Sequence, residues 1–273
     1  MFIDIISDLH IDQWDTSLHN LYPCGAIKNY PFKFPKSESK ILIIAGDIAD
    51  DLDLAIEYLD MISKTTKYEK ILYTDGNHEH VYKYPELFSI DEIDKKIKKL
   101  NNNKIVYLPK HTFKIGKVVF TGCCGWWDYD NNNLNSKKQK LKYFKNWIPE
   151  LTIQDNKDFI DNTIKQANIE YKKLDTELSL ISKNTDTQKV VIVTHTVPDI
   201  KFVSEGKFYS STELNTNMSN IIKKYNKLIS HWIFGHTHDT FELIKDNIHF
   251  VCNPRGRPED LNRIKYNITT IDI

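Results

Sequence analysis

The chain has 273 residues, of which 40% are hydrophobic and 27% are charged, and these values exclude a wholly disordered, collagen-like or membrane-embedded protein. Lysine and arginine together number 37, as do aspartate and glutamate, so no net charge attracts the chain to nucleic acid or to an acidic membrane. Duplex nucleic acid is therefore disfavoured as a partner.

The cysteines and the N-terminal residues indicate the cellular compartment. Cys24, Cys123, Cys124 and Cys252 follow no CxxC spacing and make a poor disulfide framework. The first residues lack the basic segment of a signal peptide, and no run of about 18 apolar residues occurs. We therefore expect a cytoplasmic protein without a membrane anchor; its oligomeric state is not indicated.

Short runs of β-branched or aromatic residues recur along the chain, and a polar cluster follows each of them. In chain order these predicted strands are residues 2–6, 40–45, 70–74, 190–194, 231–234 and 249–252. Residues 111–120 predict a β-hairpin around Gly116. Residues 52–67 and 90–100 have apolar side chains at helical spacing. This alternation predicts an α/β sheet, which binds ligands beyond the carboxyl ends of its strands.

From residue 128 to 189 the sequence becomes rich in Lys, Asn and Gln, with apolar residues at helical spacing. We interpret this segment as a helical insertion within a single domain that spans residues 1–273, although an independent domain is an alternative. Residues 131–133 and 136–140 are interpreted as a solvated loop tip. The insertion is either a lid over the site or a structural support.

Five polar segments begin where predicted strands stop. They are Asp8-Leu9-His10, Gly46-Asp47-Ile48-Ala49-Asp50, Gly76-Asn77-His78-Glu79, Thr194-His195-Thr196 and Gly235-His236-Thr237-His238. Nitrogen and oxygen donors without a thiolate suit Mn, Fe, Zn or similar divalent ions. Residues two apart on a strand face the same way, so Asp8 with His10, and His236 with His238, can each direct two ligands at one point.

Each fragment alone also has a mundane explanation. D-x-H and H-x-H occur by chance, G-N-H-E fits a turn, and Asp50 or Asp51 fits a helix N-cap before Leu52. Five such fragments in order at strand ends favour a metal site. A carboxylate can bridge two cations, and Asp47 is the natural bridge.

Together the segments resemble the calcineurin-like metallophosphoesterase superfamily, whose pattern is D-x-H, G-D-x-x-D, G-N-H-[DE], H and G-H-x-H. All five elements are present in order from Asp8 to His238. The resemblance implies a four-layer α-β-β-α sandwich of two mixed sheets that carries the helical insertion. It also implies two divalent metal ions, with Mn²⁺ first and Fe, Zn, Ni or Mg as alternatives.

The resemblance further implies which residues act. Carried over by position, the first ion takes Asp8, His10, Asp47 and His238, and the second takes Asp47, Asn77, His195 and His236. In such a site, ions about 3.5–4 Å apart hold a bridging hydroxide that attacks phosphorus in line. His78 resembles the family histidine that protonates the leaving group, and Asp50 matches the acid that orients it. Phosphate binding alone is the rival role for His78.

The chain departs from the protein Ser/Thr phosphatases, which continue the second motif as G-D-x-V-D-R-G with an arginine that binds phosphate. Here Asp51 and Leu52 replace Arg and Gly. An aspartate at that point repels a dianionic monoester more than a monoanionic diester, which favours a phosphodiesterase.

Candidate substrate contacts lie outside the metal motifs. Asn253 is expected close to the site, and Arg255 and Arg257 either bind phosphate or lie in a solvated Pro/Gly turn. Trp126 and Trp127 either pack in the core or form an aromatic shelf for a nucleobase or aryl leaving group. The remaining candidates are interpreted as a loop over the pocket: Lys201, Phe202, Lys207, Phe208 and Tyr209.

The resulting hypothesis is a dinuclear metal-dependent phosphoester hydrolase that acts on a small phosphodiester or a nucleotide-like phosphoester. One alternative is a protein Ser/Thr phosphatase or another phosphomonoesterase. Another is a non-catalytic metal-binding scaffold like the retromer subunit of this fold. A nuclease like the superfamily's DNA-repair enzyme is disfavoured by the neutral charge and the scarcity of arginine.

Overall fold

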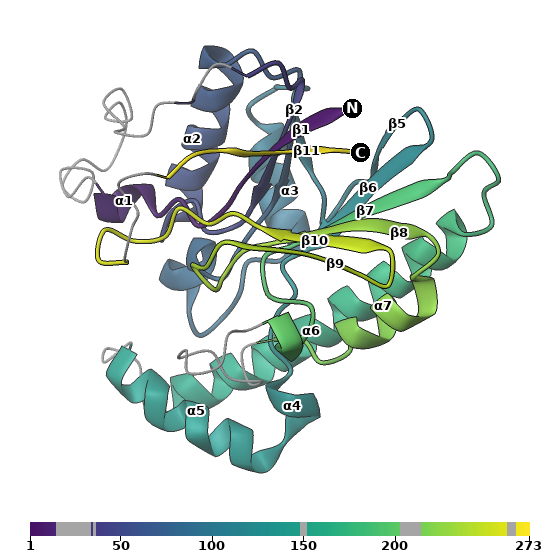
Figure 1. Cartoon of the computed structure of the whole chain (residues 1–273). Helices are drawn as coiled ribbons and strands as arrows, with labels where there is room; N and C mark the ends of the chain where they lie inside the picture. Colours follow the sequence, from purple (N-terminus) through teal and green to yellow (C-terminus); the bar gives the residue numbers. More distant parts are fainter. Residues whose placement is uncertain (15–33, 35–36, 148–151, 203–213, 261–265) are drawn as a thin grey trace.

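The computed structural model describes residues 1–14, 34, 37–147, 152–202, 214–260 and 266–273, and its strands form two sheets (Figure 1). The first sheet has the strand order β11-β1-β2-β3-β4. In that order the strands are Thr269–Asp272, Phe2–Ile6, Ile41–Ala45, Lys70–Thr74 and Ile105–Tyr107. β1 to β4 run parallel, whereas β11 pairs antiparallel with β1.

The second sheet has the strand order β5-β6-β7-β8-β10-β9. In that order the strands are Phe113–Ile115, Val118–Cys123, Lys189–Thr194, Ile229–Phe234, Ile248–Cys252 and Phe241–Lys245. The four central strands run parallel, and β5 and β9 are antiparallel edge strands. Both sheets are therefore mixed.

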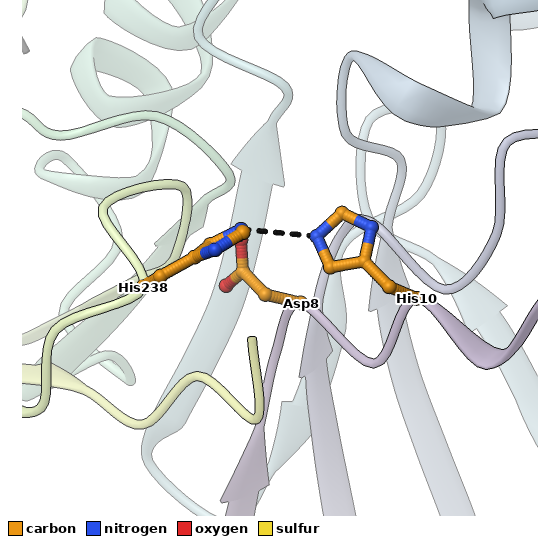
Figure 2. Close-up of side chains that lie close together, drawn as sticks. All are labelled: Asp8, His10 and His238. Atoms are coloured by element: carbon orange, nitrogen blue, oxygen red, sulfur yellow. Dashed lines mark hydrogen bonds and ion pairs between the residues drawn. The ribbon is translucent and has the colours of Figure 1, made fainter. Parts of the chain in front are cut away.

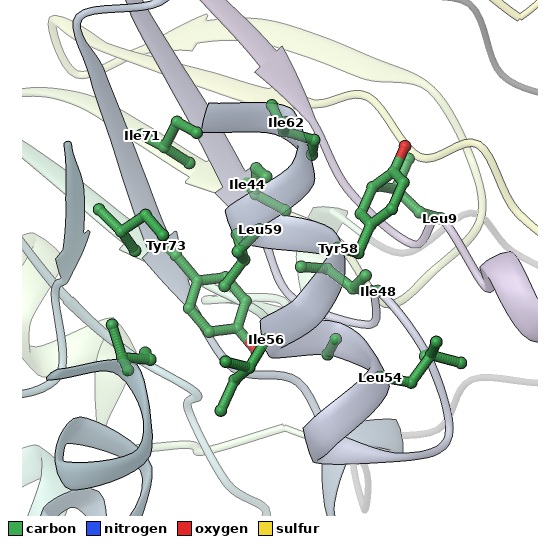
Figure 3. Close-up of a cluster of buried hydrophobic side chains, with 14 of the residues drawn as sticks. Leu9, Ile44, Ile48, Leu54, Ile56, Tyr58, Leu59, Ile62, Ile71 and Tyr73 are labelled. Carbon is green, nitrogen blue, oxygen red and sulfur yellow. The ribbon is translucent and has the colours of Figure 1, made fainter. Parts of the chain in front are cut away.

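Side-chain alternation in the parallel strands divides the core into layers. In β2, Leu42 and Ile44 pack on one face against helix α2 (Leu52–Thr65), as Figure 3 shows for Ile44. Ile41 and Ile43 lie on the other face, in a cluster with residues of the second sheet such as Val191. Helix α3 (Ile90–Lys98) also covers the outer face of the first sheet.

The outer face of the second sheet packs against α6 (Ile153–Ile181) and α7 (Met218–Tyr225). Leu178 of α6 and Ile221 of α7 lie in one cluster with Trp232 of β8. The order helix, sheet, sheet, helix confirms the expected four-layer sandwich. No helix among the described residues is long and apolar enough to cross a membrane.

The segment between β6 and β7 contains α4 (Tyr129–Asn132), α5 (Leu134–Trp147) and α6. The interpretation of residues 136–140 as a loop tip is wrong, because they lie inside α5. Ser136 and Lys140, four positions apart on one helical face, are both buried. The side chain of Asn133 accepts the N–H groups of Asn135 and Ser136 and so starts the helix.

The sequence also failed to predict three strands, namely β4, β9 and β11. The division of the chain into domains is not tested by the structure and stays a prediction.

The other described elements are short. They are α1 (Ile11–Trp14) and two 3₁₀ helices, η3 (His78–Lys83) and η4 (Ile200–Phe202).

Candidate metal centre

The five motifs meet beyond the carboxyl ends of β1, β2, β3, β7 and β8. The two sheets touch there directly, because Nδ1 of His195 lies 2.9 Å from the carbonyl oxygen of Ala45, the last residue of β2. The loops after strands of both sheets therefore share one space.

Most of the expected ligands have a left-handed backbone. Asp8, His10, Asp47, His236 and His238 have φ values of 51°, 42°, 54°, 72° and 52°. Residues other than glycine rarely adopt this region, and such conformations cluster at functional sites. The left-handed backbone, and not the alternation of a strand, therefore aims these side chains. His236 and His238 also do not direct two ligands at one point, as their spacing on a strand predicted, since they belong to different groups of potential ligands.

The first group contains Asp8, His10 and His238, which Figure 2 shows together. The Nε2 atoms of His10 and His238 are 3.0 Å apart, and Nε2 of His238 is 3.6 Å from Oδ1 of Asp8. Oδ2 of Asp47 lies 3.9 Å from Nε2 of His10. The four residues expected to hold the first ion thus converge.

The second group contains Asp47, His195 and His236. Nε2 of His195 is 3.2 Å from Oδ2 of Asp47 and 3.1 Å from Oδ1 of Asn77. Nδ1 of His236 is 3.3 Å from the same His195 nitrogen. The expected ligands of the second ion also converge, and Asp47 faces both groups.

Two motif glycines allow this close approach. A Cβ atom on Gly46, whose φ is +79°, would lie 2.5 Å from Nδ1 of His195. A Cβ atom on Gly76 would overlap Oδ1 of Asp47. Any side chain at either position would displace a potential ligand.

The chemistry of the donor set fits divalent cations. Burial, followed by the nearby His78, holds the pKa of His10 well below its usual range, and burial followed by His195 does the same to the pKa of His236. Both rings are therefore neutral and have a lone pair. Lone pairs of neutral imidazoles and carboxylate oxygens repel one another unless a proton or a metal ion lies between them.

The pKa values of Asp47 and His195 also indicate that a positive charge between them is stabilised. Burial alone would raise the pKa of Asp47, but His195 and His78 outweigh it and hold that pKa well below its ordinary value. Burial would likewise lower the pKa of His195, but Asp47 raises it to about 10. A metal ion can replace that proton, because the other ring nitrogen of His195 is fixed on the carbonyl of Ala45.

His78 lies beside the two groups of potential ligands, and the side chains of Asp50, Arg257 and Asp47 approach its ring. Its Nδ1 is 2.6 Å from Oδ1 of Asp50, and its Nε2 is 2.9 Å from Nη2 of Arg257 and 3.9 Å from Oδ2 of Asp47. Burial opposes protonation, but Asp47 and Asp50 raise the pKa of His78 overall. His78 also forms a group of potential ligands with His10 and Asp47.

Asp51, the residue that replaces the phosphatase arginine, is the N-cap of α2. Its carboxylate accepts the N–H groups of Asp53 and Leu54 at 2.7 and 3.0 Å. Asp51 therefore has the capping role, whereas Asp50 contacts His78. Because its charge is engaged at the helix terminus, Asp51 is weaker evidence against a dianionic substrate than the sequence indicated.

The structure places the other candidate substrate residues mainly in the core. Trp126 and Trp127 are 1% and 3% exposed in an aromatic cluster with Phe159, so neither indole has an exposed face to serve as a shelf. The amide of Asn253 donates to the carbonyl oxygens of Ile5 and Asn267. Trp126 and Asn253 thus pack in the core, whereas the buried ring of Trp127 lies beside that of His236, with centroids 5.9 Å apart.

The expected loop over the pocket is only partly described. Phe202 is buried and packs on Phe250, with ring centroids 4.4 Å apart, and Lys201 is exposed. Lys207, Phe208 and Tyr209 lie outside the described residues, as does Cys24. The other three cysteines are buried.

Two acidic residues without an assigned role also contact the site. Glu79, buried beneath it, accepts the N–H groups of Asp47, Ile48 and Gly76 at 3.1, 2.6 and 2.7 Å, and burial raises its pKa to about 8. Glu79 is the last residue of the G-N-H-E motif, and this position in the sequence could have indicated a role at the site. Oδ2 of Asp260 lies 2.6 Å from Nδ1 of His238, and no sequence motif marks it.

Comparison with known proteins identifies the family of this chain. A family model for calcineurin-like phosphoesterases matches residues 1–240. "Uncharacterized protein L509" of Acanthamoeba polyphaga mimivirus is 23% identical over an alignment of 282 positions that covers 94% of this chain and 91% of the relative.

Among solved structures, the phosphopantetheinyl hydrolase PptH of Mycobacterium tuberculosis has the same fold. The TM-score is 0.71 at 17% identity, over 98% of this chain and 95% of that one. On the match over residues 1–240, this chain belongs to the calcineurin-like phosphoesterase family and is a metal-dependent hydrolase of phosphoesters.

Proposed function

We propose that the protein is a phosphodiesterase with two divalent metal ions, of which Mn²⁺ is the first candidate. Asp8, His10, Asp47 and His238 would hold one ion, and Asp47, Asn77, His195 and His236 the other. The observation that supports two ions is the position of Asp47, whose Oδ2 lies 3.2 Å from Nε2 of His195 and 3.9 Å from Nε2 of His10. One carboxylate oxygen thus faces both groups.

The metal ions, when bound, supply Lewis-acid charge to a phosphoryl group and activate water. The chain itself supplies a proton donor and its orientation. The carboxylate of Asp50 accepts the Nδ1–H of His78, so the imidazole turns Nε2 toward the metal ligands. From that position Nε2 can give a proton to the leaving oxygen of the substrate.

The charges around the site favour a substrate with one negative charge. The carboxylates of Asp8 and Asp47 are fully buried, and Asp12, whose pKa burial and Asp50 raise to about 6, accepts the N–H of Asp50. Within the described residues, Arg257 is the one lysine or arginine whose side chain hydrogen-bonds His78 or an expected ligand. Besides the two metal ions, the described residues thus bring one cation and several carboxylates to the site, and we infer that a phosphodiester monoanion fits it better than a monoester dianion.

The test compares Mn²⁺-supported hydrolysis of bis-p-nitrophenyl phosphate with that of p-nitrophenyl phosphate. A chelated sample and the same sample after metal is restored are the controls. We expect the diester to react faster. A faster monoester would overturn the diester proposal and favour a phosphomonoesterase, for which a phosphopeptide is the next substrate. No hydrolysis with Mn, Fe, Zn, Ni or Mg would favour a non-catalytic metal-binding scaffold.

A further inference from the structure

Residues 253–260 follow β10 and lie beyond the part of the chain that the family model matches. Their backbone nevertheless runs beside the loop that carries Asp8. The N–H of Ser7 donates to the carbonyl of Asn253, the N–H of Arg255 to the carbonyl of Ser7, and the N–H of Gly256 to the carbonyl of Asp8, at 2.8–3.1 Å. This segment is therefore fixed to the metal centre.

The two arginines of this segment have different surroundings. Arg255 is 5% exposed, and its guanidinium stacks over the ring of Trp14, 4.0 Å from the ring centroid. Nε1 of Trp14 donates to the carbonyl of Gly256 at 2.9 Å, which closes this packing unit. Arg257 points instead to the site, where its Nη2 lies 2.9 Å from Nε2 of His78. Arg255 is a packing residue, and Arg257 is the arginine available to a substrate.

The contact between Arg257 and His78 leaves the guanidinium of Arg257 short of hydrogen-bond acceptors. A guanidinium only donates hydrogen bonds, so Nε2 of His78 must act as an acceptor in this arrangement. A guanidinium has five N–H donors, and Nε2 of His78 can accept only one of them. The Nε atom of Arg257 is buried and has no hydrogen-bond partner among the described residues. A phosphoryl group offers the oxygen acceptors that match a guanidinium.

Asp260 connects Arg257 to the metal ligands. Its Oδ2 accepts the backbone N–H of Arg257 at 2.6 Å and lies 2.6 Å from Nδ1 of His238. A carboxylate on the outer nitrogen of a metal-binding histidine fixes the ring so that the other nitrogen faces the metal. One oxygen thus orients a ligand and the arginine together.

We propose that Arg257 binds a non-bridging oxygen of the substrate's phosphoryl group and that Asp260 positions both Arg257 and His238. The proposal rests on the proposed function. It assigns substrate binding to residues 253–260, beyond the region that this chain shares with the family model.

The test uses the full chain and the variants Arg257→Gln, Arg257→Lys and Asp260→Asn. Lys40→Gln is the control, because it removes one exposed cation before β2, at the far end of the strand from the site. For each protein we would measure bound Mn²⁺, affinity for inorganic phosphate by calorimetry on the Mn²⁺-loaded protein, and kcat and KM for bis-p-nitrophenyl phosphate. Thermal unfolding shows whether each variant folds. If Arg257→Gln does not fold, Arg257→Lys is compared with the wild type in its place.

Arg257→Gln is expected to weaken phosphate binding about 10- to 100-fold and to raise KM, with bound Mn²⁺ unchanged. Arg257→Lys should restore part of this affinity. Asp260→Asn should weaken both phosphate binding and Mn²⁺ binding, the latter about 10- to 100-fold.

Two results would overturn the inference. One is an Arg257→Gln protein that loses kcat but binds phosphate as the wild type does, since Arg257 would then act on His78 alone. The other is an Asp260→Asn protein with unchanged affinity for both Mn²⁺ and phosphate. If the wild type hydrolyses nothing, the proposed function fails, whereas the calorimetry still decides whether Arg257 binds phosphate.

Discussion

Two fully buried aspartates lie four positions apart, Asp4 within β1 and Asp8 just after it. Asp4 accepts hydrogen bonds from the hydroxyl groups of Ser39, Tyr68 and Thr270 at 2.6–2.7 Å. Asp8 accepts the backbone N–H of His236 and faces a ring nitrogen of His238. Both carboxylates are equally removed from water.

The difference lies in what the partners can donate. A hydroxyl group rotates to give its hydrogen to a carboxylate, so the shell around Asp4 is complete without any cation. Around Asp8 and Asp47 the partners include imidazole nitrogens whose lone pairs need a proton or a metal ion. Burial of a carboxylate therefore does not by itself indicate a metal site. Neighbouring groups that present lone pairs to the carboxylate, and do not donate hydrogen bonds to it, do indicate one.

Among the variants that test this difference, Asp47→Asn is expected to have the largest effect on metal content and turnover. It removes the charge that both ligand groups share, so bound metal should fall below two ions per chain and turnover should decrease at least about 10³-fold. Metal analysis and phosphodiester assays measure the two effects. Asp4→Asn is the matched control, with full metal content. Retention of two ions and of turnover by Asp47→Asn would refute the bridging position of Asp47.

His78→Ala should separate catalysis from metal binding. Loss of a proton donor lowers turnover about 10²- to 10⁴-fold, and we expect bound metal to remain nearly unchanged. The same metal analysis and assays apply. An equal loss of metal in His78→Ala and Asp47→Asn would show that His78 is a ligand, as its grouping with His10 and Asp47 permits.

Asp4→Ala should change stability instead of chemistry. It leaves the hydroxyl groups of the buried Ser39 and Tyr68 and of the exposed Thr270 without their acceptor, which costs about 2–4 kcal/mol in the free energy of unfolding. Urea denaturation measures this cost, and Asp4→Asn should lose less because an amide oxygen still accepts. Metal content and turnover per folded molecule should match the wild type; a loss of metal would contradict the distinction between the two aspartates.

The smallest effect is expected at His231, on β8 and away from the metal ligands. Burial, followed by His249 and Lys189, lowers the pKa of His231 to about 4, although Asp272 opposes them. The unfolded chain therefore takes up a proton more readily between pH 6.5 and 4, so stability falls as the pH decreases through that window. The change is at most about 3 kcal/mol.

His231→Gln tests this dependence by urea denaturation at pH 7 and pH 4.5, with chelator present so that metal loss does not contribute. The variant should lose less stability than the wild type between the two pH values. Equal losses would show that His231 is not the group responsible.

The sequence predicted the strands that matter most for the site, because each ends an apolar run at a polar motif. It did not predict β4, which has three residues, or β9, whose apolar Leu243 and Ile244 are exposed. It also misread residues 136–140, because lysine and glutamine are as compatible with a helix surface as with a loop.

The convergence of the seven expected ligands could be predicted from the resemblance of the motifs, but its geometry could not. Left-handed conformations at Asp8 and His238 depend on tertiary contacts and leave no periodic pattern. Asp260 was missed for the same reason, since it reaches His238 through a loop and follows no motif. The difference between Arg255 and Arg257 likewise became visible only with Trp14 in place.

Two expected ligands of the first ion come from opposite ends of the chain, which bears on biosynthesis. His10 and His238 face each other at 3.0 Å although 228 positions separate them. Domains begin to fold during synthesis from their N-terminal part, but this centre cannot form before β8 and the loop after it have left the ribosome. We therefore expect the complete set of ligands to bind metal only after nearly the whole chain has been translated, because a product that terminates before β8 would lack His236 and His238.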